Sequence, residues 1–338
     1  MSKRVLLTGA GGFVGSHVLR HFLENTDWYI VVTDSFRRVG SMDRIAEQVK
    51  GEESRGRLQV HVADLSVPLS LRAAHVIGDV DYIVNVASDS HVDRSITSPR
   101  ECVENNVQLV LTLLEHARQW GCEKFIQVST DEVYGPAPVG YAHKEGEPHR
   151  PSNPYSASKA AQEDICYAYW RTYDVPVIVT NTMNLFGEMQ HPEKFVPGTL
   201  AKVLRGETVK IHAAPDGTIG SRMWLHARNQ ADALLFILRE LEIAGDEMPR
   251  LNVVGQREIN NLAMAGLIAA VAALPLEWEL ADFHTSRPGH DLRYALDGSR
   301  LEAFGWKPPV PFEESLRRTV EWTMQHSEWL LSESLVAA

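Results

Sequence analysis

The sequence predicts an α/β fold, with a doubly wound parallel sheet and a smaller C-terminal lobe. In the first part of the chain, short β-branched runs alternate with helical patterns, as in strands joined by crossover helices. The strand runs are almost continuously apolar, which is typical of a parallel sheet covered by helices on both faces. After Asn184 this rhythm breaks, and prolines and glycines punctuate the chain. We therefore expect one domain over residues 1–184 and a lobe formed mainly by residues 185–338, with part of the later chain returning to the first domain.

Individual segments justify this fold class in chain order. The expected strands are Val5–Thr8, Tyr29–Thr33, Leu58–Val62, Tyr82–Val86, Phe125–Val128 and Val175–Thr180. The expected helices are Ser16–Glu24, Met42–Lys50, Pro99–Trp120 and Asn153–Tyr173. The uncharged apolar stretch from Leu262 to Leu276 is too short to span a bilayer and contains Pro275, so we expect a core helix there.

The composition narrows the class of protein. With 44% hydrophobic and 23% charged residues, the 338-residue chain has the composition of a soluble globular protein. Its net charge of −11 argues against a nucleic-acid or membrane partner. The 3 cysteines have no CxxC spacing, and no export signal is visible. These features predict reduced thiols and a cytoplasmic location.

A glycine-rich loop follows the first expected strand. Residues 8–16 read TGAGGFVGS, and Gly9, Gly12 and Gly15 would let the backbone turn tightly and approach a pyrophosphate at the start of the next helix. Asp34 ends the second strand, where a carboxylate can bind the adenosine ribose and repel a 2′-phosphate. This combination predicts a Rossmann-type domain that binds NAD. The alternative is that the glycines serve packing alone.

Residues around this motif are expected to complete the cofactor site. Arg37 and Arg38 keep NADP open as an alternative to NAD. Asp64, after the third strand, is expected to bind the adenine amino group or to cap the next helix. The further cofactor contacts that we expect are Phe13, Val14, Ser35, Phe36, Leu65, Val86, Ala87 and Ser88.

Tyr155 and Lys159 lie four residues apart on an expected helix and therefore face the same way. A free tyrosine, with a pKa of about 10, is a poor base near neutrality. An ammonium group and an oxidised nicotinamide nearby would lower that pKa. Behind a dinucleotide motif, the pair therefore predicts a base for hydride transfer, with Lys159 also holding the nicotinamide ribose. The alternative is an ordinary aromatic residue beside a solvated lysine.

Two adjacent acids, Asp131 and Glu132, follow the fifth expected strand in the segment STDEVYG (129–135). They form either a solvated polar turn or an acid–base pair. Neighbours in a regular strand point to opposite faces, so both acids can reach one substrate only if the strand has already ended. Gly135 and Pro136 suggest that it has. In a closed site, two such carboxyls tend to divide into one protonated and one charged group.

Together these segments resemble the extended short-chain dehydrogenase/reductase superfamily, and within it the nucleotide-sugar 4,6-dehydratases, dTDP-glucose 4,6-dehydratase most of all. The resemblance runs nearly end to end, and its combination of motifs is specific. The motifs are TGAGGFVGS (8–16), SHVDRSI (90–96), STDEVYG (129–135), YSASK (155–159), HPEKFVP (191–197) and RPGHDLRYA (287–295).

The resemblance implies a lyase reaction in which bound NAD is used and regenerated. Tyr155 would take the proton of the sugar C4 hydroxyl as hydride passes to NAD, and Thr130 would bond that oxygen. Glu132 would remove the C5 proton, and protonated Asp131 would donate to the leaving C6 hydroxyl. Return of hydride to C6 would give a 4-keto-6-deoxy sugar. Together with Lys159, these residues are the expected catalytic set.

The resemblance also implies contacts to the nucleotide sugar. The expected substrate residues are Ser90, His91, Thr130, Asn184, Lys194, Phe195, Arg222, Asn252, Arg287 and His290. Several positions depart from the commoner dTDP-glucose pattern, among them Ser88-Asp89, Leu185-Phe186, Met223 and the long segment 212–222. These departures lie mostly on the substrate side and leave the base and the sugar open.

dTDP-glucose is the substrate that we expect. The alternatives are another enzyme of the superfamily, such as an NDP-hexosamine dehydratase, an epimerase or a decarboxylase, and a non-catalytic NAD-binding sensor. The Asp131–Glu132 pair argues against a simple epimerase. A sensor could dispense with Tyr155, Lys159 and Glu132, all of which are present.

We expect a homodimer and no metal site. His17 and His21 have a spacing that can bind metal, but no third ligand is evident. The expected helix 99–120 carries a second apolar stripe that includes Leu113 and Trp120. One stripe can cover the sheet, and the second needs another cover, which we expect to be a second subunit. The alternative is cover by the chain's own loops.

Overall fold

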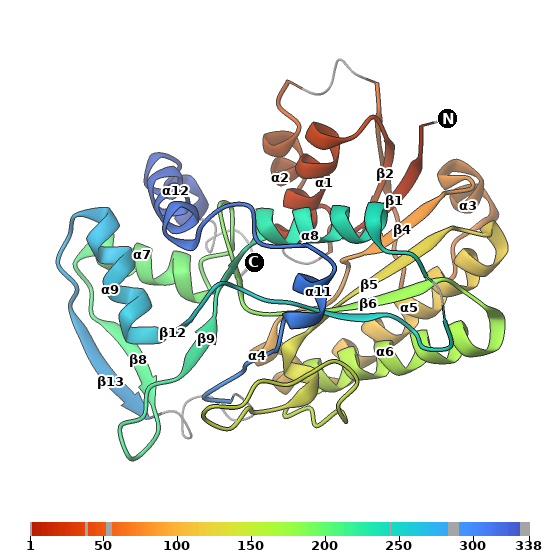
Figure 1. The fold of residues 1–338 in the computed structure, drawn as a ribbon. Coiled ribbons are helices and arrows are strands. Elements are labelled where there is room, and N and C mark those ends of the chain that lie inside the picture. The colour runs from red at the N-terminus through yellow and green to blue at the C-terminus, as the bar shows by residue number, and fades with distance from the viewer. Residues whose placement is uncertain (1, 38–39, 52–55, 244, 283–290, 332–338) are drawn as a thin grey trace.

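A seven-stranded parallel sheet forms the centre of the molecule (Figure 1). The computed structural model describes residues 2–37, 40–51, 56–243, 245–282 and 291–331. The strand order is β11-β6-β5-β4-β1-β2-β3. The strands are β1 (Arg4–Thr8), β2 (Tyr29–Asp34), β3 (Leu58–Val62), β4 (Tyr82–Asn85), β5 (Lys124–Thr130), β6 (Val177–Thr182) and β11 (Arg250–Val253). The predicted doubly wound fold is confirmed, and β11 is a strand that the later chain returns to the sheet edge.

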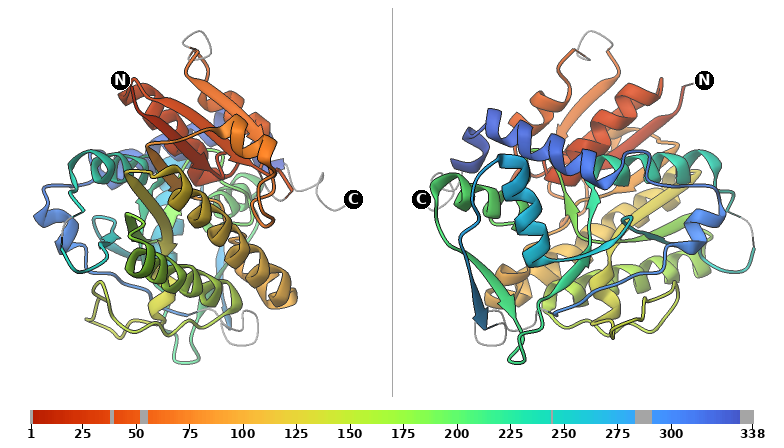
Figure 2. Two further views of the ribbon diagram at one scale, coloured as in Figure 1. Left: turned by 90° about the vertical axis from the view of Figure 1, so that its right-hand side faces the viewer. Right: turned by 60° about the vertical axis from the view of Figure 1, so that its left-hand side comes forward.

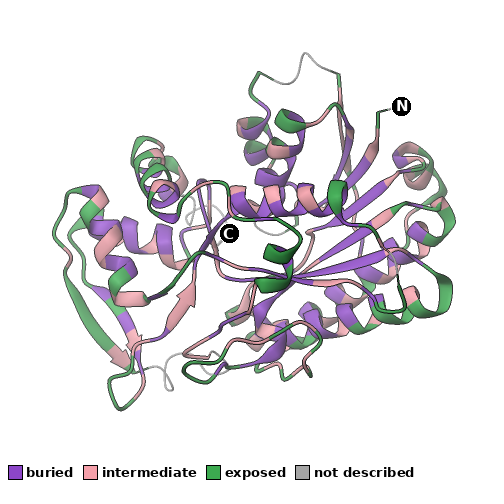
Figure 3. Ribbon diagram, viewed as in Figure 1, coloured by how far each residue is buried: buried purple, intermediate pink, exposed green. Residues whose placement is uncertain are grey.

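Helices cover both faces of this sheet (Figures 1 and 2). One face carries α1 (Phe13–Asn25), α2 (Met42–Gln48), α8 (Ala227–Glu240) and α11 (Ser299–Ala303). The other carries α3 (Leu71–Ile77), α5 (Pro99–Trp120) and α6 (Pro154–Tyr173), with the short α4 (Val92–Thr97) packed against α5 and α6. The strands are therefore buried on both sides, as their colouring in Figure 3 shows.

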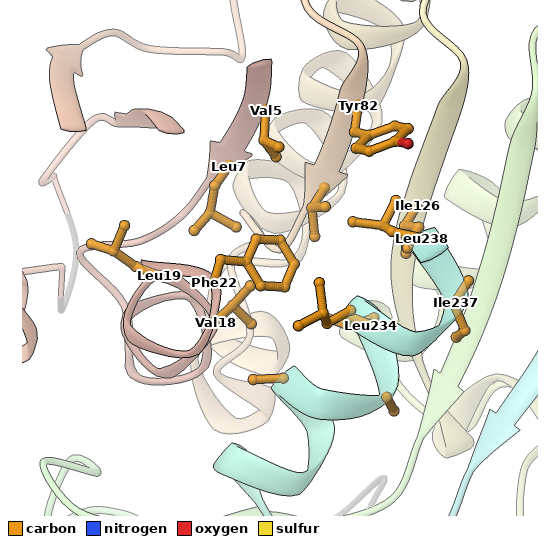
Figure 4. Packing of buried hydrophobic residues seen from close by; sticks show 14 of the residues in the cluster. Val5, Leu7, Val18, Leu19, Phe22, Tyr82, Ile126, Leu234, Ile237 and Leu238 are labelled. Atoms are coloured by element: carbon orange, nitrogen blue, oxygen red, sulfur yellow. The ribbon is translucent and has the colours of Figure 1, made fainter. Parts of the chain in front are cut away.

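Alternate side chains along each strand pack into two separate cores, one on each face of the sheet. Val5 and Leu7 of β1 pack with α1 and α8, whereas Leu6 packs with α5. Figure 4 shows the first of these cores, where Phe22 of α1 faces Leu234 of α8. The near-continuous apolar runs of the sequence thus reflect burial on both faces.

Local signals explain where the two long helices begin and end. Pro99 occupies the first turn of α5, and Gly121 ends it in a left-handed conformation with φ = 64°. Asn153 caps α6 by accepting from the backbone N–H of Ser156, whose hydroxyl bonds back to the Asn153 backbone. This cap fixes the first turn of the helix that carries Tyr155 and Lys159.

The smaller lobe packs around its own core at the left of Figure 1. Its helices are α7 (Phe195–Arg205), α9 (Asn261–Ala272), α12 (Phe312–Gln325) and α13 (Glu328–Leu331). Its short strands pair as β7 (Leu185–Phe186) with β10 (Leu225–His226), β9 (Ser221–Met223) with β12 (Glu258–Asn260), and β8 (Val209–Ala213) with β13 (Trp278–Asp282). Helix α9 coincides with much of the apolar stretch that predicted a core helix. The exact boundary at residue 184 stays a prediction.

The prediction that Leu113 of α5 lies at a subunit interface was wrong. Leu113 is 0% exposed and belongs to the core between α5, α6 and the sheet. Trp120 is partly buried against the same core. The reason is that α6 lies beside α5 and covers the stripe within one chain.

None of the helices in the described ranges is both long and apolar enough to cross a membrane.

Candidate active site

A cavity of about 480 Å³ opens where the carboxyl ends of the central strands meet the lobe. From β1 the chain adds β2 and β3 on one side and then β4, β5 and β6 on the other, so the strand order reverses between β1 and β4. Doubly wound sheets bind their ligands at such a switch point. The walls come from the glycine loop, from the segments that follow β2, β3, β4 and β5, from the start of α6, and from the lobe segment before α7. Both halves of the molecule therefore contribute to one site.

The glycine loop lies closely packed at the base of this cavity. Gly9 has φ = +72°, and a Cβ there would lie 2.8 Å from the backbone N and Cα of Ala87. A Cβ on Gly15 would lie 2.2 Å from the carbonyl oxygen of Gly9. Gly12 is the N-cap of α1 and brings no side-chain cap, so the first amides of the helix can bind an anion. The loop thus offers a phosphate-binding turn.

Asp34 shapes the same end of the cavity. Its Oδ2 accepts from the N–H of Gly11 at 3.0 Å, and its Oδ1 accepts from the N–H of Phe36 at 2.9 Å. Both bonds fix the orientation of the carboxylate, and the residue lines the cavity. A phosphate-binding helix start beside a fixed carboxylate fits the pyrophosphate and ribose of a dinucleotide.

Asp64 does not cap a helix, because Ser70 accepts from the N–H of Ala73 and caps α3. Asp64 instead accepts from the N–H of Ser66 at 2.9 Å and pairs with Arg37 at 2.8 Å. Arg37 is therefore already engaged by a carboxylate, which weakens its case as a 2′-phosphate ligand. Arg38 lies outside the described residues.

Phe36 is the one expected cofactor contact that does not line the cavity. It adopts φ = 51°, and its ring lies against Gly11, where a Cβ would be 2.6 Å from Phe36 Cε1. The ring packs partly against the core of α1 and α8. Phe36 therefore packs between the glycine loop and the core.

Asp131 and Glu132 both line the cavity because β5 ends at Thr130. A short 3₁₀ turn, η2 (Asp131–Tyr134), begins directly afterwards and breaks the alternation of a strand. The Thr130 hydroxyl donates to Asp131 Oδ1 at 2.9 Å and accepts from the N–H of Glu132 at 3.3 Å. The expectation that the chain leaves the strand at these acids is confirmed.

The two acids differ in their surroundings. Asp131 is 5% exposed, and burial followed by the charge of Glu132 raises its pKa to about 7. Its Oδ2 is buried without a hydrogen-bond partner among the described residues. Burial also raises the pKa of Glu132, but its Oε2 accepts from Asn153 Nδ2 at 3.0 Å, and Arg222 and Lys194 favour its charged form. The arrangement favours a protonated Asp131 beside an ionised Glu132.

Tyr155 and Lys159 enter the cavity from the first turns of α6. Lys159 Nζ donates to the carbonyl oxygen of Val128 at 2.7 Å, and burial lowers its pKa to about 8. Burial and the charges of Glu132 and Asp131 raise the pKa of Tyr155, while a hydrogen bond with Thr130 opposes them. The surrounding protein therefore does not make Tyr155 a base, and a bound cation would have to supply the missing stabilisation.

The substrate residues expected from the sequence divide into three groups. Those that line the cavity are Ser90, His91, Thr130, Asn184, Lys194, Phe195 and Arg222. Asn252 does not, and this expectation was wrong: it is 0% exposed, and its Nδ2 donates to the carbonyls of His143 at 3.1 Å and Asp297 at 3.0 Å. It ties β11 to two loops. Arg287 and His290 lie outside the described residues.

Other residues in or beside the cavity were missed: Glu193 and Tyr294 line it, and Asn153 contacts Glu132 from behind. Asn153 orients Glu132, and its position before Pro154 is the helix-start signal that could have found it. Glu193 pairs with His91 Nε2 at 2.7 Å across the two halves of the molecule. The Arg222 guanidinium stacks on Tyr294, with Cζ 4.6 Å from the centre of the ring. The contacts of Glu193 and Tyr294 join segments far apart in the chain, so no local pattern indicates them.

The two histidines that have a metal-binding spacing contact other groups in the fold. His17 Nε2 lies 3.1 Å from the carbonyl of Glu188, and His21 Nε2 lies 3.4 Å from Asp232 Oδ2. Within the described ranges, no three His, Cys, Asp or Glu residues come together in a way that could hold a metal ion.

Residues 5–253 match the model of the NAD dependent epimerase/dehydratase family. This chain belongs to that family. The low-salt glycan biosynthesis protein Agl12 of Haloferax volcanii is 36% identical over 96% of this chain and 99% of its own length. The dTDP-glucose 4,6-dehydratase 1 of Escherichia coli is 33% identical over 97% of this chain and 94% of its own length.

The structure of this epimerase/dehydratase family member also resembles solved ones. DesIV, the dTDP-glucose 4,6-dehydratase of Streptomyces venezuelae, was solved with NAD and TYD bound. It superposes with a TM-score of 0.85 at 32% identity, covering 96% of this chain and 98% of that one. The predicted superfamily and the prediction of an NAD-dependent enzyme are confirmed at the level of the family.

Proposed function

We propose that this protein is a nucleotide-sugar 4,6-dehydratase, a hydro-lyase, with dTDP-glucose as its substrate. The observation that carries the proposal is the turn at Asp131 and Glu132, which brings two acids of different character into the cavity of Tyr155 and Lys159. Proton removal from C5 and departure of the C6 hydroxyl need one charged and one protonated carboxyl. An oxidation at C4 alone needs neither.

The residues of the glycine loop and of Asp34 fit NAD, as described above. The expected contacts of Val14, Ser35, Leu65, Val86 and Ser88 belong to the same proposal, since all five line the cavity. When bound, NAD would accept hydride from the sugar C4 and return it to C6. The nicotinamide cation and Lys159 would together favour the Tyr155 phenolate, which the protein alone disfavours.

The residues of this chain would move three protons. Tyr155 takes the proton of the C4 hydroxyl, and Thr130 holds that oxygen through its own hydroxyl. Glu132, oriented by Asn153, removes the C5 proton that a 4-ketone makes acidic. Asp131 gives its proton to the C6 hydroxyl, which leaves as water. Proton return to C5 completes the 4-keto-6-deoxy product.

Several features support a diphosphate-linked sugar. Lys194 and Arg222 are cavity-lining cations in an otherwise acidic protein, and guanidinium and ammonium groups bind pyrophosphate. The E. coli and S. venezuelae relatives are dTDP-glucose 4,6-dehydratases, which favours this base and sugar. The relation to Agl12, a low-salt glycan biosynthesis protein, is consistent with a role in sugar metabolism.

The test is to incubate purified protein with a panel of nucleotide sugars and to follow each by mass spectrometry. We expect dTDP-glucose to lose one water with no added cofactor and no steady accumulation of NADH. An isomer of unchanged mass would identify an epimerase, and stoichiometric NADH would identify a plain dehydrogenase. Loss of water from another sugar alone would keep the reaction and correct the substrate.

Assembly as a homodimer and a cytoplasmic location remain proposals. With Leu113 inside the core, an interface on α6 would use its exposed aromatic side chains, Tyr167 at 48% and Tyr173 at 46% exposure. We expect a double Tyr167→Glu, Tyr173→Glu variant to sediment as a monomer, because it would place unpaired charges in the interface. An unchanged dimer would place the interface elsewhere.

A further inference from the structure

Glu163 is a buried acid one turn beyond Lys159 on α6, and it has no part in the reaction described so far. Its side chain is 0% exposed, and each carboxylate oxygen has two partners. Oε1 accepts from Ser129 Oγ at 2.5 Å and from Asn181 Nδ2 at 2.7 Å. Oε2 lies 3.2 Å from His149 Nε2 and 3.3 Å from Arg250 NH1. A buried carboxylate with four partners is firmly held in one position.

These partners come from four different segments. Ser129 belongs to β5, Asn181 to β6 and Arg250 to β11, and His149 lies in the loop before α6. Glu163 itself adds α6. One carboxylate therefore joins the three adjacent strands at the catalytic end of the sheet to the helix that carries Lys159.

The network reaches the catalytic turn through the backbone. Ser129 directly precedes Thr130, and Asn181 Nδ2, which donates to Glu163, also donates to the carbonyl oxygen of Thr130 at 3.2 Å. Asn181 Oδ1 in turn accepts from the Tyr134 hydroxyl at 3.4 Å, at the far end of η2. Both ends of the turn that carries Asp131 and Glu132 are thus held by the network around Glu163.

The same carboxylate acts on Lys159 through its charge. Residues four apart on a helix are neighbours, and the charge of Glu163 opposes the lowering of the Lys159 pKa by burial. The groups that face Glu163 from other elements are Arg250 and His149. The pKa of His149 is raised, first by its hydrogen bond with Glu163, and its Nδ1 lies 3.4 Å from the exposed Asp164.

We propose that Glu163 is a positioning residue for the reaction: its buried carboxylate holds the end of β5 and the turn that carries Asp131 and Glu132, and its negative charge stabilises the ammonium group of Lys159 one turn away on α6. This inference rests on the proposed function for its catalytic meaning. Its electrostatic part concerns Lys159 alone and can be measured without any sugar.

The direct test is a titration of Lys159 in the NAD-loaded protein. The ¹³Cε signal of labelled lysine is followed by NMR against pH, and Lys159→Met assigns it. In Glu163→Gln, loss of the neighbouring negative charge should lower the Lys159 midpoint by about one pH unit. Glu163→Asp keeps the charge and should restore it. A folded Glu163→Gln protein with an unchanged midpoint would overturn the proposal.

Asp164→Asn is the matched control. It removes the next acid on the same helix, which contacts the same histidine but is 69% exposed. We expect its Lys159 midpoint to match that of the wild type, and an equal shift in both variants would contradict a specific role for Glu163. Should Glu163→Gln fail to fold, Arg250→Gln removes a positive charge and should raise the midpoint instead. A lowered or unchanged midpoint there would equally overturn the proposal.

The rate of NADH formation in a single turnover with dTDP-glucose, measured against pH, tests the effect of Glu163 on catalysis. The high-pH loss of rate should begin at lower pH in Glu163→Gln than in the wild type, while a purely structural role would lower the rate equally at every pH. If wild-type protein forms no NADH with any nucleotide sugar, the proposed function fails, and the lysine titration still decides this inference.

Discussion

Two aspartates at opposite ends of one cavity have opposite surroundings. Asp34, at the end of β2, accepts from two backbone N–H groups, one on each carboxylate oxygen. Asp131, just beyond β5, is 5% exposed and has a buried Oδ2 without a partner among the described residues. Burial raises the pKa of Asp131 to about 7. The same side chain at the same edge of the sheet is therefore suited to bind a hydroxyl in one place and to donate a proton in the other.

The comparison extends to how each end is built. The nucleotide end is set by backbone geometry within residues 8–16 and by one acid. The catalytic end is set by side chains from distant segments, such as Asn153 on Glu132 and Glu163 behind Thr130. Substitutions at the first end should release the cofactor, and substitutions at the second should change proton transfer with the cofactor still bound.

The largest effect is expected from Gly15→Ala. Its Cβ would lie 2.2 Å from the carbonyl oxygen and 2.7 Å from the carbonyl carbon of Gly9, so α1 must move away from the loop. We expect loss of the bound NAD and a destabilisation of about 3 kcal/mol. Thermal unfolding and the absorbance of nucleotide released on denaturation measure the two effects.

Gly266→Ala is the control for this change. It lies within α9, and its Cβ would meet nothing within 4 Å, so it should retain NAD and gain up to about 1 kcal/mol. A Gly15→Ala protein that keeps both its cofactor and its melting temperature would show that the loop is not closely packed.

Asp131→Asn should slow water elimination by about 10²- to 10⁴-fold, because an amide keeps the shape but cannot donate the proton. NAD should stay bound. Asp34→Ala should do the reverse and release NAD, since it removes the acceptor of two loop amides. Product formation by mass spectrometry and retained nucleotide measure both. If the two variants failed in the same way, the two ends of the cavity would not be functionally distinct.

The raised pKa of Asp131 also predicts a pH-dependent difference in stability. The folded protein keeps this proton up to a pKa of about 7, whereas the unfolded chain releases it near the ordinary aspartate pKa of 3.8. The free energy of unfolding therefore falls, on account of this group, as pH rises from about 4 to about 7. Asp131→Asn lacks this dependence. Its stability relative to the wild type should grow by about 2 to 3 kcal/mol between pH 5 and pH 8.

Urea unfolding at the two pH values measures this difference, and Asp34→Asn serves as the comparison at the other end of the cavity. A stability difference for Asp131→Asn that is the same at both pH values would mean that Asp131 is ionised throughout.

A smaller effect is expected from Asn153→Asp. Aspartate can still cap α6 but no longer donates to Glu132, and it adds a second negative charge. The pKa of Glu132, already raised by burial, should rise further, so the low-pH limb of the rate should move to higher pH. A shift of one unit reduces the rate on that limb about tenfold. Asn260 caps α9 in the same way, and Asn260→Asp should not shift the low-pH limb of the pH–rate profile. If both variants shifted it equally, the effect would be a general one of the added charge.

The fold was largely readable from the sequence because its signals are local. Apolar strand runs, the glycine loop, Pro99 and the Asn153-Pro154 helix start each act within a few residues. Before residue 184, the helices α3 and α4 were missed, since they are only 7 and 6 residues long and bury little apolar surface. Helices α7, α8 and α12 of the later chain were not predicted individually. The second stripe of α5 was read as an interface because periodicity does not say which neighbour covers it.

The site was predictable where one segment carries both the residue and its signal. Asp131, Glu132, Tyr155 and Lys159 all reach the cavity as expected. Asn252 does not reach the cavity. Its Nδ2 instead donates to backbone carbonyls of two loops that come together only in the folded chain. The roles of Glu193 and Tyr294 depend on similar long-range contacts, which no local sequence pattern indicates. The cap position of Asn153 has a local signal, but its contact with Glu132 does not.

In the proposed mechanism, Glu132 acts on the C5 proton, after the oxidation at C4. Stopped-flow absorbance of the nicotinamide in a single turnover tests it most directly, with dTDP-glucose and the NAD-loaded Glu132→Gln and Tyr155→Phe variants. Glutamine keeps the shape of Glu132 but removes no proton, so this variant should form NADH and stall with a 4-keto sugar bound. Tyr155→Phe should form neither. A Glu132→Gln protein that turns over at the wild-type rate, or that forms no more NADH than Tyr155→Phe, would contradict the account.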